Sequence, residues 1–330
     1  MSRDAVYRYL LEREGEFLSG QEICQQLEIS RTAVWKAIEG LRQDGCDIEA
    51  RRGLGYCLLS SPDALTEREI RRYLSPETDC PQLNTFEEID STNSYLKREA
   101  LRGAAHGAVA VANHQTAGRG RLSRSFQSPA GKGVYLSILL RPELTPEALM
   151  GVTGMAAVAA ARAVERFIDG PVGIKWTNDL VLNGRKLCGI LTEMSLEGET
   201  GRVQSLVIGV GVNVLHRSED LSPEVAEIAT SLSQEGCTVS RPALAAALVE
   251  ELYRLGRELG GDLTPWVEEY RRRCVNLGRE VRLLWTEGQK RGRALDIDDK
   301  FGLVVRLEDG TCTTVRTGEA SVRGLYGYTD

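Results

Sequence analysis

A block in the middle of the chain alternates apolar runs with helix-like stretches, and this alternation limits the possible fold more than any other feature. The stretches 147–168 and 241–259 have the apolar spacing of helices, and Asn183-Gly184 between two apolar runs predicts a tight hairpin turn. The block therefore predicts an α+β domain with much antiparallel sheet. The apolar runs that predict its strands are 108–113, 134–140, 172–176, 186–193 and 205–214.

The first 62 residues predict a separate domain. Ser30 is placed to cap a helix whose core-facing stripe is Val34, Ile38 and Leu41, and a shorter helix precedes it, so 20–39 has the pattern of a helix-turn-helix. Two short strands after it add a basic hairpin, which makes a winged helix-turn-helix, a DNA-binding fold. A plain helical bundle is the alternative, because acidic residues slightly outnumber basic ones here. The residues expected to contact DNA are Arg31, Thr32, Trp35, Lys36, Arg51 and Arg52.

The remaining boundaries follow from changes in pattern. Thr66 and Glu69 resemble a capping box that begins a helix, so the central domain is expected to cover 66–272. Within 275–330 the chain consists of short apolar segments separated by glycines, which predict a small β-barrel.

Composition indicates the cellular compartment of the protein and the classes of partner it can bind. A net charge of −6 argues against a basic coat for nucleic acid over the whole surface, although a local basic face is compatible with it. Eight cysteines without a C-x-x-C pair, and three histidines without metal-ligand spacing, argue against a disulfide framework or structural zinc. The charged N-terminus excludes a secretory signal, and no apolar run is expected to reach membrane-spanning length. These features predict a cytoplasmic protein without a membrane partner.

The stretch AGRGRLSRSF at 117–126 places three arginines on a glycine-rich backbone. Neither the G-x-x-x-x-G-K-[ST] phosphate loop nor the G-x-G-x-x-G dinucleotide motif is present. Arg119, Arg121 and Arg124 instead offer planar forks for oxyanions, and the loop is expected to stay disordered until an anion binds. A solvated surface loop or a basic patch for nucleic acid would have the same residues.

Five motifs follow one another along the central block. They are DSTN at 90–93, QTAGRGR at 115–121, KWTND at 175–179, GILTE at 189–193 and GVGVN at 209–213. Taken singly, each has an ordinary explanation, such as a helix N-cap or a strand end. In this order and spacing they resemble the biotin–protein ligases, and with the winged helix the chain resembles the bifunctional class, the biotin operon repressors. The resemblance covers nearly the whole chain. It implies a ligase domain of the biotin/lipoate ligase type and an SH3-like C-terminal barrel.

The resemblance also implies roles for particular residues. The biotin-binding set would be Ser91, Thr92, Asn93, Gln115, Arg119, Gly120, Arg121, Lys175 and Gly189, with Ile190 beside it. Lys175, Arg119 and Arg121 would be the catalytic groups. The adenylate would be bound by Arg121, Arg124, Asn178 and Asn213. No fixed metal site is implied, but Mg²⁺ bound with ATP is expected near Asp179.

The activity implied is activation of biotin by ATP to biotinoyl-5′-AMP and transfer of biotin to a lysine of a biotin carboxyl carrier domain of a biotin-dependent carboxylase. The repressor half implies binding to operator DNA at biotin biosynthesis genes, by a homodimer that biotinoyl-AMP induces. Cys188 would be a small residue of the pocket wall rather than an acyl carrier, because the reaction needs no enzyme nucleophile.

Three positions depart from the common family pattern: Ser123 replaces a glycine, Phe126 a tryptophan and Thr177 a proline. None removes a charge, so they bear on loop closure rather than on activity. Three alternatives stay open: a lipoate-type ligase, a regulator that senses biotin without ligating it, and a ligase with a vestigial DNA-binding domain. The first lacks a winged helix and this arginine loop, and intact Arg119, Arg121 and Lys175 argue against the second.

Overall fold

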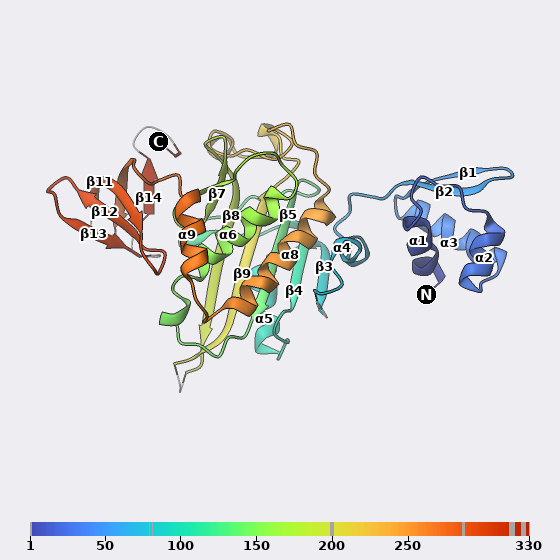
Figure 1. Cartoon of the computed structure of the whole chain (residues 1–330), viewed down its shortest axis with the longest axis horizontal. Coiled ribbons are helices and arrows are strands. Elements are labelled where there is room, and N and C mark those ends of the chain that lie inside the picture. Colours follow the sequence, from blue (N-terminus) through green and yellow to red (C-terminus); the bar gives the residue numbers. More distant parts are fainter. Residues whose placement is uncertain are drawn as a thin grey trace. The chain divides into compact units, whose positions relative to one another are not determined.

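The computed structural model describes residues 2–78, 80, 82–198, 201–285, 288–316, 321–324 and 328–329, with the side chains of 123, 285 and 321–324 excepted. Two compact units divide the chain, 1–63 and 64–330 (Figure 1). The first boundary agrees with the break expected after residue 62. Each unit has its own core, so each is described by itself.

The first unit is a winged helix-turn-helix, as predicted. Ser19 and Ser30 cap the second and third helices by accepting hydrogen bonds from the backbone N–H groups of Glu22 and Ala33. Val34, Ile38 and Leu41 are buried, which confirms the predicted stripe. The elements are α1 (Ser2–Leu11), α2 (Gly20–Leu27), α3 (Arg31–Gln43), β1 (Asp47–Arg51) and β2 (Gly55–Ser60).

The hairpin of this unit depends on one glycine. Gly55 has φ +110°, and a Cβ there would lie 2.0 Å from the carbonyl oxygen of Leu18. The close approach lets Leu18 and Tyr56 exchange two backbone hydrogen bonds of 2.8 and 2.9 Å. Glycine is therefore required here both for conformation and for space, and the hairpin is attached to the chain that leads into α2.

The second unit is built on a seven-stranded sheet of order β3-β4-β5-β9-β8-β7-β6, in which β3 and β4 are parallel and the other pairs antiparallel. Asn183 and Gly184 both have positive φ, at 49° and 77°, in the turn between β7 and β8, which confirms the predicted hairpin. The strands are β3 (Leu83–Ile89), β4 (Val109–Gln115), β5 (Gly133–Leu140), β6 (Gly173–Lys175), β7 (Asp179–Leu182), β8 (Arg185–Leu196) and β9 (Val203–Asn213).

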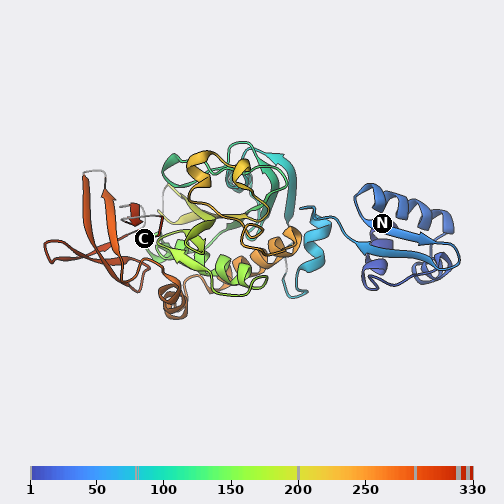
Figure 2. The same ribbon diagram turned by 90° about the horizontal axis from the view of Figure 1, so that it is seen from above.

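Helices cover the two faces of this sheet unequally. On one face, α6 (Val152–Glu165) and α8 (Arg241–Glu258) pack side by side in the main core (Figures 1 and 2). On the other face, α5 (Thr92–Leu101) covers a smaller apolar cluster that includes Leu139 and Val207. This second face is covered only over part of its length by α5, which leaves room for a cavity beyond the first turn of that helix.

The helix predicted at 147–168 is divided. A short turn, η2 (Glu147–Leu149), precedes α6. The ring of Phe301 packs against Gly151 and Gly154, and a Cβ added to either glycine would lie only 2.7 Å or 2.1 Å, respectively, from the nearest ring atom. The stretch Glu147–Glu165 is long and apolar enough to cross a membrane by length and composition, so the expectation that no run reaches that length is wrong. Since 78% of its most apolar window is buried in the core, it is a core helix.

The C-terminal part forms a five-stranded antiparallel sheet of order β13-β12-β11-β10-β14. It is joined to the central domain through Trp176, whose indole N–H donates to the carbonyl of Phe301 at 2.9 Å. The strands are β10 (Glu280–Trp285), β11 (Gly288–Ile297), β12 (Leu303–Leu307), β13 (Cys312–Val315) and β14 (Ser321–Gly324). The other elements of this unit are α4 (Glu67–Tyr73), η1 (Arg121–Ser123), η3 (Ser218–Asp220), α7 (Pro223–Ala226) and α9 (Thr264–Arg273).

Candidate active site and nucleic-acid interface

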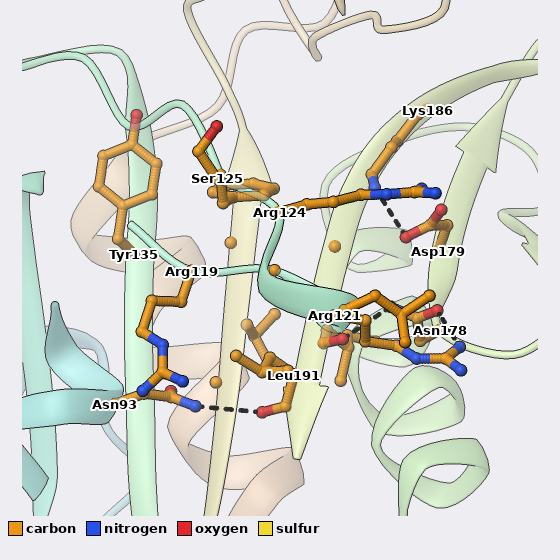
Figure 3. Close-up of a pocket in the computed structure, with 18 of the residues that line it drawn as sticks. Asn93, Arg119, Arg121, Arg124, Ser125, Tyr135, Asn178, Asp179, Lys186 and Leu191 are labelled. Carbon is orange, nitrogen blue, oxygen red and sulfur yellow. Dashed lines mark hydrogen bonds and ion pairs between the residues drawn. The ribbon is translucent and has the colours of Figure 1, made fainter. Parts of the chain in front are cut away.

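A cavity of about 410 Å³ lies on the same face of the sheet as α5. Leu139 and Val207 pack under α5. Because side chains alternate between faces, Tyr135 on β5 and Gly209 and Gly211 on β9 share that face, and they line the cavity. Its walls combine these strands with the 118–128 loop (Figure 3). The lining includes Ser91, Thr92, Asn93, Gln115, Arg119, Gly120, Arg121, Leu122, Arg124, Ser125, Phe126, Tyr135, Lys175, Asn178, Asp179, Lys186, Gly189, Ile190, Gly209, Gly211, Arg282 and Tyr328.

One end of the cavity is a neutral polar cluster. The Gln115 Oε1 accepts from the Thr92 backbone N–H at 2.9 Å and from the Thr92 hydroxyl at 3.2 Å. Ser137 lies 2.7 Å from the Thr92 hydroxyl and donates to the Asn93 Oδ1 at 2.6 Å. Ser91 caps α5 through its contact with the Ser94 N–H, and it also lines the cavity. These fixed donors and acceptors suit a small uncharged polar group.

The arginine loop lies over this cavity with a defined backbone path. Gly118 is needed because a Cβ there would meet the carbonyl oxygen of Phe126 at 2.3 Å. The Phe126 ring lies on Gly189 and Gly211, a cross-strand pair of β8 and β9, where added Cβ atoms would come within 2.9 and 2.5 Å of ring atoms. The pair of glycines thus makes a flat floor for the aromatic ring. Disorder of the loop without an anion stays a prediction.

Arg119 contacts a carboxylate at the neutral end. Its guanidinium is 3.3 Å from the Glu193 Oε1, which Lys97 also approaches at 2.8 Å. The other oxygen of Glu193 accepts from the Asn93 amide at 3.0 Å. Burial would raise the pKa of Glu193, but Lys97, Asn93 and Arg119 outweigh it and lower that pKa. Glu193 therefore stays ionised and holds Arg119 beside Asn93.

Arg121 points to the other end of the cavity (Figure 3). Its guanidinium donates to the Asn178 Oδ1 at 3.0 Å, and Asn178 is itself fixed by donating to the Ile190 carbonyl at 2.8 Å. Burial lowers the pKa of Arg121, while the charge of Asp179 works in the opposite direction. A hydrogen bond to a neutral amide does not balance the positive charge of a partly buried guanidinium. This end of the cavity therefore favours an anionic ligand.

Lys175 ends β6 inside the cavity wall and is buried. Its ammonium lies 3.4 Å from the centre of the Tyr328 ring, close to the end of the chain. The Tyr328 hydroxyl donates to the Asp179 Oδ2, and Lys186 lies 2.8 Å from the Asp179 Oδ1. Lys186 and Tyr328 thus both contact the carboxylate of Asp179, the residue opposite Lys175 in the β6–β7 pair.

Asp179, near which Mg²⁺ bound with ATP is expected, has protein partners of its own. Burial would raise the pKa of Asp179, but Lys186, Tyr328 and Lys175 together lower it, so the group is an anion balanced by protein cations. Both of its oxygens have protein partners. Among the residues that the structure describes, no group of three or more His, Cys, Asp or Glu could hold a metal ion. Mg²⁺ bound with ATP near Asp179 stays a prediction.

Two other residues that the sequence analysis placed at the site lie outside the cavity lining. Cys188 is not a wall residue of the cavity, because it points to the α6–α8 face, one residue from Gly189, and burial strongly raises the pKa of its thiol. Asn213 is buried outside the cavity lining, and its amide donates to the Thr230 carbonyl at 2.9 Å. Its observed contact holds the 229–232 segment; nucleotide binding by Asn213 stays a prediction.

The structure thus brings most of the predicted site residues together. Every residue predicted for biotin or adenylate lines one cavity, with the exception of Asn213. The participants without a role in the sequence-based prediction include Ser137, Glu193, Lys186 and Tyr328. Glu193 ends the GILTE motif and Ser137 interrupts the apolar run 134–140, so both carried a signal. No pattern points to Tyr328.

The first unit carries the predicted nucleic-acid face. Arg31, Arg51 and Arg52 line a shallow groove between α3 and the hairpin, next to Gly20 at the N-terminus of α2. Thr32, Trp35 and Lys36 are exposed on α3, with 56% of Trp35 accessible. Arg51 is paired with Glu49 at 2.6 Å and stacks on Phe17. A helix N-terminus beside arginines suits phosphate groups.

Comparison with known families assigns the three parts of the chain. Residues 85–213 match the Biotin/lipoate A/B protein ligase family. Residues 2–57 match an HTH domain, and residues 277–323 match the Biotin protein ligase C terminal domain. The three matches follow the order winged helix, catalytic sheet and C-terminal sheet.

Curated relatives and solved structures agree with this assignment. The Bifunctional ligase/repressor BirA of Bacillus subtilis (strain 168) is 38% identical over 299 residues, covering 89% of this chain and 91% of the relative. The protein of the same name from Escherichia coli (strain K12) is 33% identical, covering 94% of each chain. The biotin protein ligase from Aquifex aeolicus in complex with biotin and ATP is 27% identical, with a TM-score of 0.63 over 74% of this chain and 99% of that chain.

Proposed function

Since this chain belongs to the biotin protein ligase family, in its bifunctional ligase and repressor class, we propose that it activates biotin with ATP and transfers it to a lysine of a carrier domain. The observation that carries the proposal is the polarity of one cavity. Its neutral end, at Thr92, Asn93 and Gln115, suits the uncharged ureido head of biotin. Its cationic end, at Arg121 and Lys175, suits the carboxylate and the α-phosphate.

The cationic end explains the first half of the reaction. The biotin carboxylate attacks the α-phosphorus of ATP and pyrophosphate leaves, so two anions must meet. Lys175 and Arg121 both line the cavity. Their charges lower the repulsion between the two anions and stabilise the charge that develops on the phosphorus. We assign Lys175, Arg119 and Arg121 as the catalytic groups, and Arg124 and Asn178 as further adenylate contacts.

The loop explains how the product survives. Biotinoyl-5′-AMP is a mixed anhydride that water would hydrolyse, and the loop with Phe126 covers the floor where it would form. The acceptor lysine of the carrier domain then attacks the carbonyl carbon, and AMP leaves with the bonding electrons. No enzyme nucleophile takes part, in agreement with the buried thiol of Cys188 on the other face.

Mg²⁺ fits this site as a companion of the nucleotide phosphates. Asp179 is engaged by Lys186 and Tyr328, so the described side chains do not make a fixed magnesium site. When bound with ATP, the ion would neutralise charge on the phosphates. The residues of the chain itself bind, orient and shield the reactants.

The direct test is label transfer. The protein is incubated with labelled biotin, Mg-ATP and a biotin carboxyl carrier domain, and the carrier is analysed for covalent label; a carrier with its acceptor lysine changed to arginine is the control. We expect transfer to the first carrier only. Lipoate in place of biotin, with a lipoyl acceptor domain, should give no transfer. Transfer of lipoate but not of biotin would instead establish the lipoate-type ligase.

For the regulatory half, we propose binding to operator DNA at biotin biosynthesis genes, with biotinoyl-AMP as corepressor. The groove of Arg31, Arg51 and Arg52 with the exposed Trp35 and Lys36 supports it. A gel shift on a biotin-operon promoter should tighten when biotin and ATP are added. Binding no tighter than to unrelated DNA would leave a ligase with a vestigial DNA-binding domain.

We further propose that biotinoyl-AMP induces a homodimer and that the carrier domain competes for the same surface. The 117–126 loop would link ligand binding to association, because it covers the ligand site and also carries Leu122, which is 66% exposed and free to contact a second protein. Sedimentation should show a larger species only with biotin and ATP. An unchanged association state would rule this coupling out.

We place the protein in the cytoplasm, without a membrane partner. All eight cysteines are free thiols, five of them buried, as expected for a reducing compartment. Most of the apolar helix α6 is buried in the core, which supports a core helix rather than a membrane span.

A further inference from the structure

Tyr328 comes from the far end of the sequence and nevertheless lines the catalytic cavity. It follows the last strand of the C-terminal sheet, whereas the other walls come from 91–228 and from Arg282. Its position is fixed by the residue beside it. Thr329 is buried, contacts the Gly184 carbonyl in the β7–β8 turn at 3.5 Å, and accepts from Arg279 through its own carbonyl at 3.0 Å.

The ring and the hydroxyl of Tyr328 contact different residues. The ring lies 3.4 Å from the Lys175 ammonium, and the hydroxyl donates to the Asp179 Oδ2. Lys175 and Asp179 are opposite one another in the β6–β7 pair, the arrangement in which a lysine and a carboxylate ordinarily form an ion pair. Here Tyr328 and Lys186 occupy the carboxylate, and the lysine lies against the ring.

This arrangement matters for a cationic catalytic group. Asp179 attracts Lys175 electrostatically, but the same carboxylate also contacts Lys186 and Tyr328. A ring face supports an ammonium through its quadrupole without cancelling its charge. The ring also limits the directions that the flexible lysine side chain can take, so its charge is aimed into the cavity.

We propose that Tyr328 is a positioning residue of the adenylation step, which acts through Lys175. The inference rests on the proposed ligase function, and it gives the segment that follows the C-terminal sheet an indirect part in the adenylation step. Tyr328 itself supplies no proton or nucleophile to the reaction.

The test compares Tyr328→Leu and Tyr328→Phe in the full chain by biotin-dependent exchange of labelled pyrophosphate into ATP. Loss of the ring should lower the exchange kcat about 10-fold to 30-fold, the change expected for a desolvated cation–π contact, while KM for biotin changes less than about 2-fold. Phenylalanine keeps the ring and should restore most of the rate. Tyr73→Leu is the matched control, because Tyr73 packs against Arg72 at 5.0 Å outside the cavity.

A double variant separates positioning from a general loss of structure. If Tyr328 acts through Lys175, Tyr328→Leu should cost little in a Lys175→Ala background, measured at higher enzyme concentration over longer times. The inference would be overturned, with the ligase function intact, by either of two results. One is a double variant whose loss of exchange rate equals the product of the losses of the two single variants. The other is a Tyr328→Leu exchange rate within about 2-fold of wild type. No exchange by the wild-type protein would instead overturn the proposed function, and this inference with it.

Discussion

The arginines of the 117–126 loop and those of the winged helix carry the same charge but stand in different surroundings. In the loop, Arg119 contacts Glu193 and Arg121 contacts Asn178, within a cavity of about 410 Å³. On the winged helix, Arg31 and Arg52 line a shallow groove that is open to solvent. Fixed, partly buried cations select one small anion by position, whereas exposed cations attract a polyanion by charge alone.

This difference predicts separate consequences for the two regions. Changes in the cavity should affect chemistry and retention of the adenylate, with little dependence on salt. Changes on the winged helix should affect a salt-dependent affinity and leave the chemistry intact.

Lys175→Ala should have the largest effect. Loss of a cation that stabilises the developing charge should lower biotin-dependent pyrophosphate exchange about 100-fold to 1,000-fold, while the winged-helix unit stays folded and binds nonspecific DNA as before. Lys132→Ala is the control, because Lys132 pairs with Asp220 at 3.1 Å outside the cavity lining. Exchange at the wild-type rate in Lys175→Ala would refute its assignment.

Arg121→Ala should speed the escape of biotinoyl-AMP about 10-fold to 100-fold, since a charge-assisted contact to the phosphate is lost. The affinity for ATP alone should fall less, because the loop closes over the completed adenylate. Dissociation is followed by chasing labelled adenylate with unlabelled biotin and ATP, and ATP binding by calorimetry. Equal losses for both ligands would mean that the loop is only an ATP clamp.

Acid should destabilise the catalytic unit through His216, whereas the first unit has no histidine. Burial lowers the pKa of His216 from the usual 6.5 to about 4. The unfolded chain then binds a proton that the folded chain does not, so stability is lost as the pH falls from 6.5 toward 4. Between pH 7 and 5 this loss is about 2 kcal/mol. Urea unfolding at both pH values should show it, and His216→Gln should lose this part of the pH dependence in the transition of unit 64–330 only.

Arg52→Ala should weaken operator binding several-fold and lower the slope of log affinity against log salt by about 1, as one phosphate contact is lost. Pyrophosphate exchange should not change. Arg13→Ala is the matched control in the same unit, because Arg13 pairs with Glu22 at 2.6 Å and is not in the groove. An unchanged salt slope in Arg52→Ala would place the DNA contacts elsewhere.

Ser123→Gly should have the smallest effect. Glycine raises the entropy lost when the loop orders, so biotinoyl-AMP should escape about 2-fold to 5-fold faster. The serine side chain lies outside the described residues. Slower escape would indicate that the closed loop needs a left-handed backbone at this position.

The sequence predicted what is periodic or local. The stripe of α3, the Ser30 cap and the Asn183-Gly184 turn follow from short-range rules, and the structure agrees with them. The start of the long predicted helix was placed too early: α6 begins at Val152, where Phe301, far along the chain, packs against Gly151 and Gly154. The same reason applies to Tyr328, which reaches Lys175 only through the tertiary fold.

Within the site, residue types were easier to predict than the direction of side chains. Cys188 and Gly189 are neighbours, yet they belong to opposite faces of β8, and only the strand register decides which one meets the ligand. Asn213 follows the same alternation as Gly211, but its amide is bound to the 229–232 segment.

The glycine floor of the cavity has a consequence for engineering the enzyme toward bulkier biotin analogues. A Cβ added to Gly209 would lie 2.1 Å from the Asn93 Oδ1, and a Cβ added to Gly189 or Gly211 would collide with the Phe126 ring. Library mutagenesis of the floor would therefore fill space that is already taken. Variation of the loop side, at Leu122 and Phe126, leaves the sheet untouched and is the more fruitful place to search for altered substrate range.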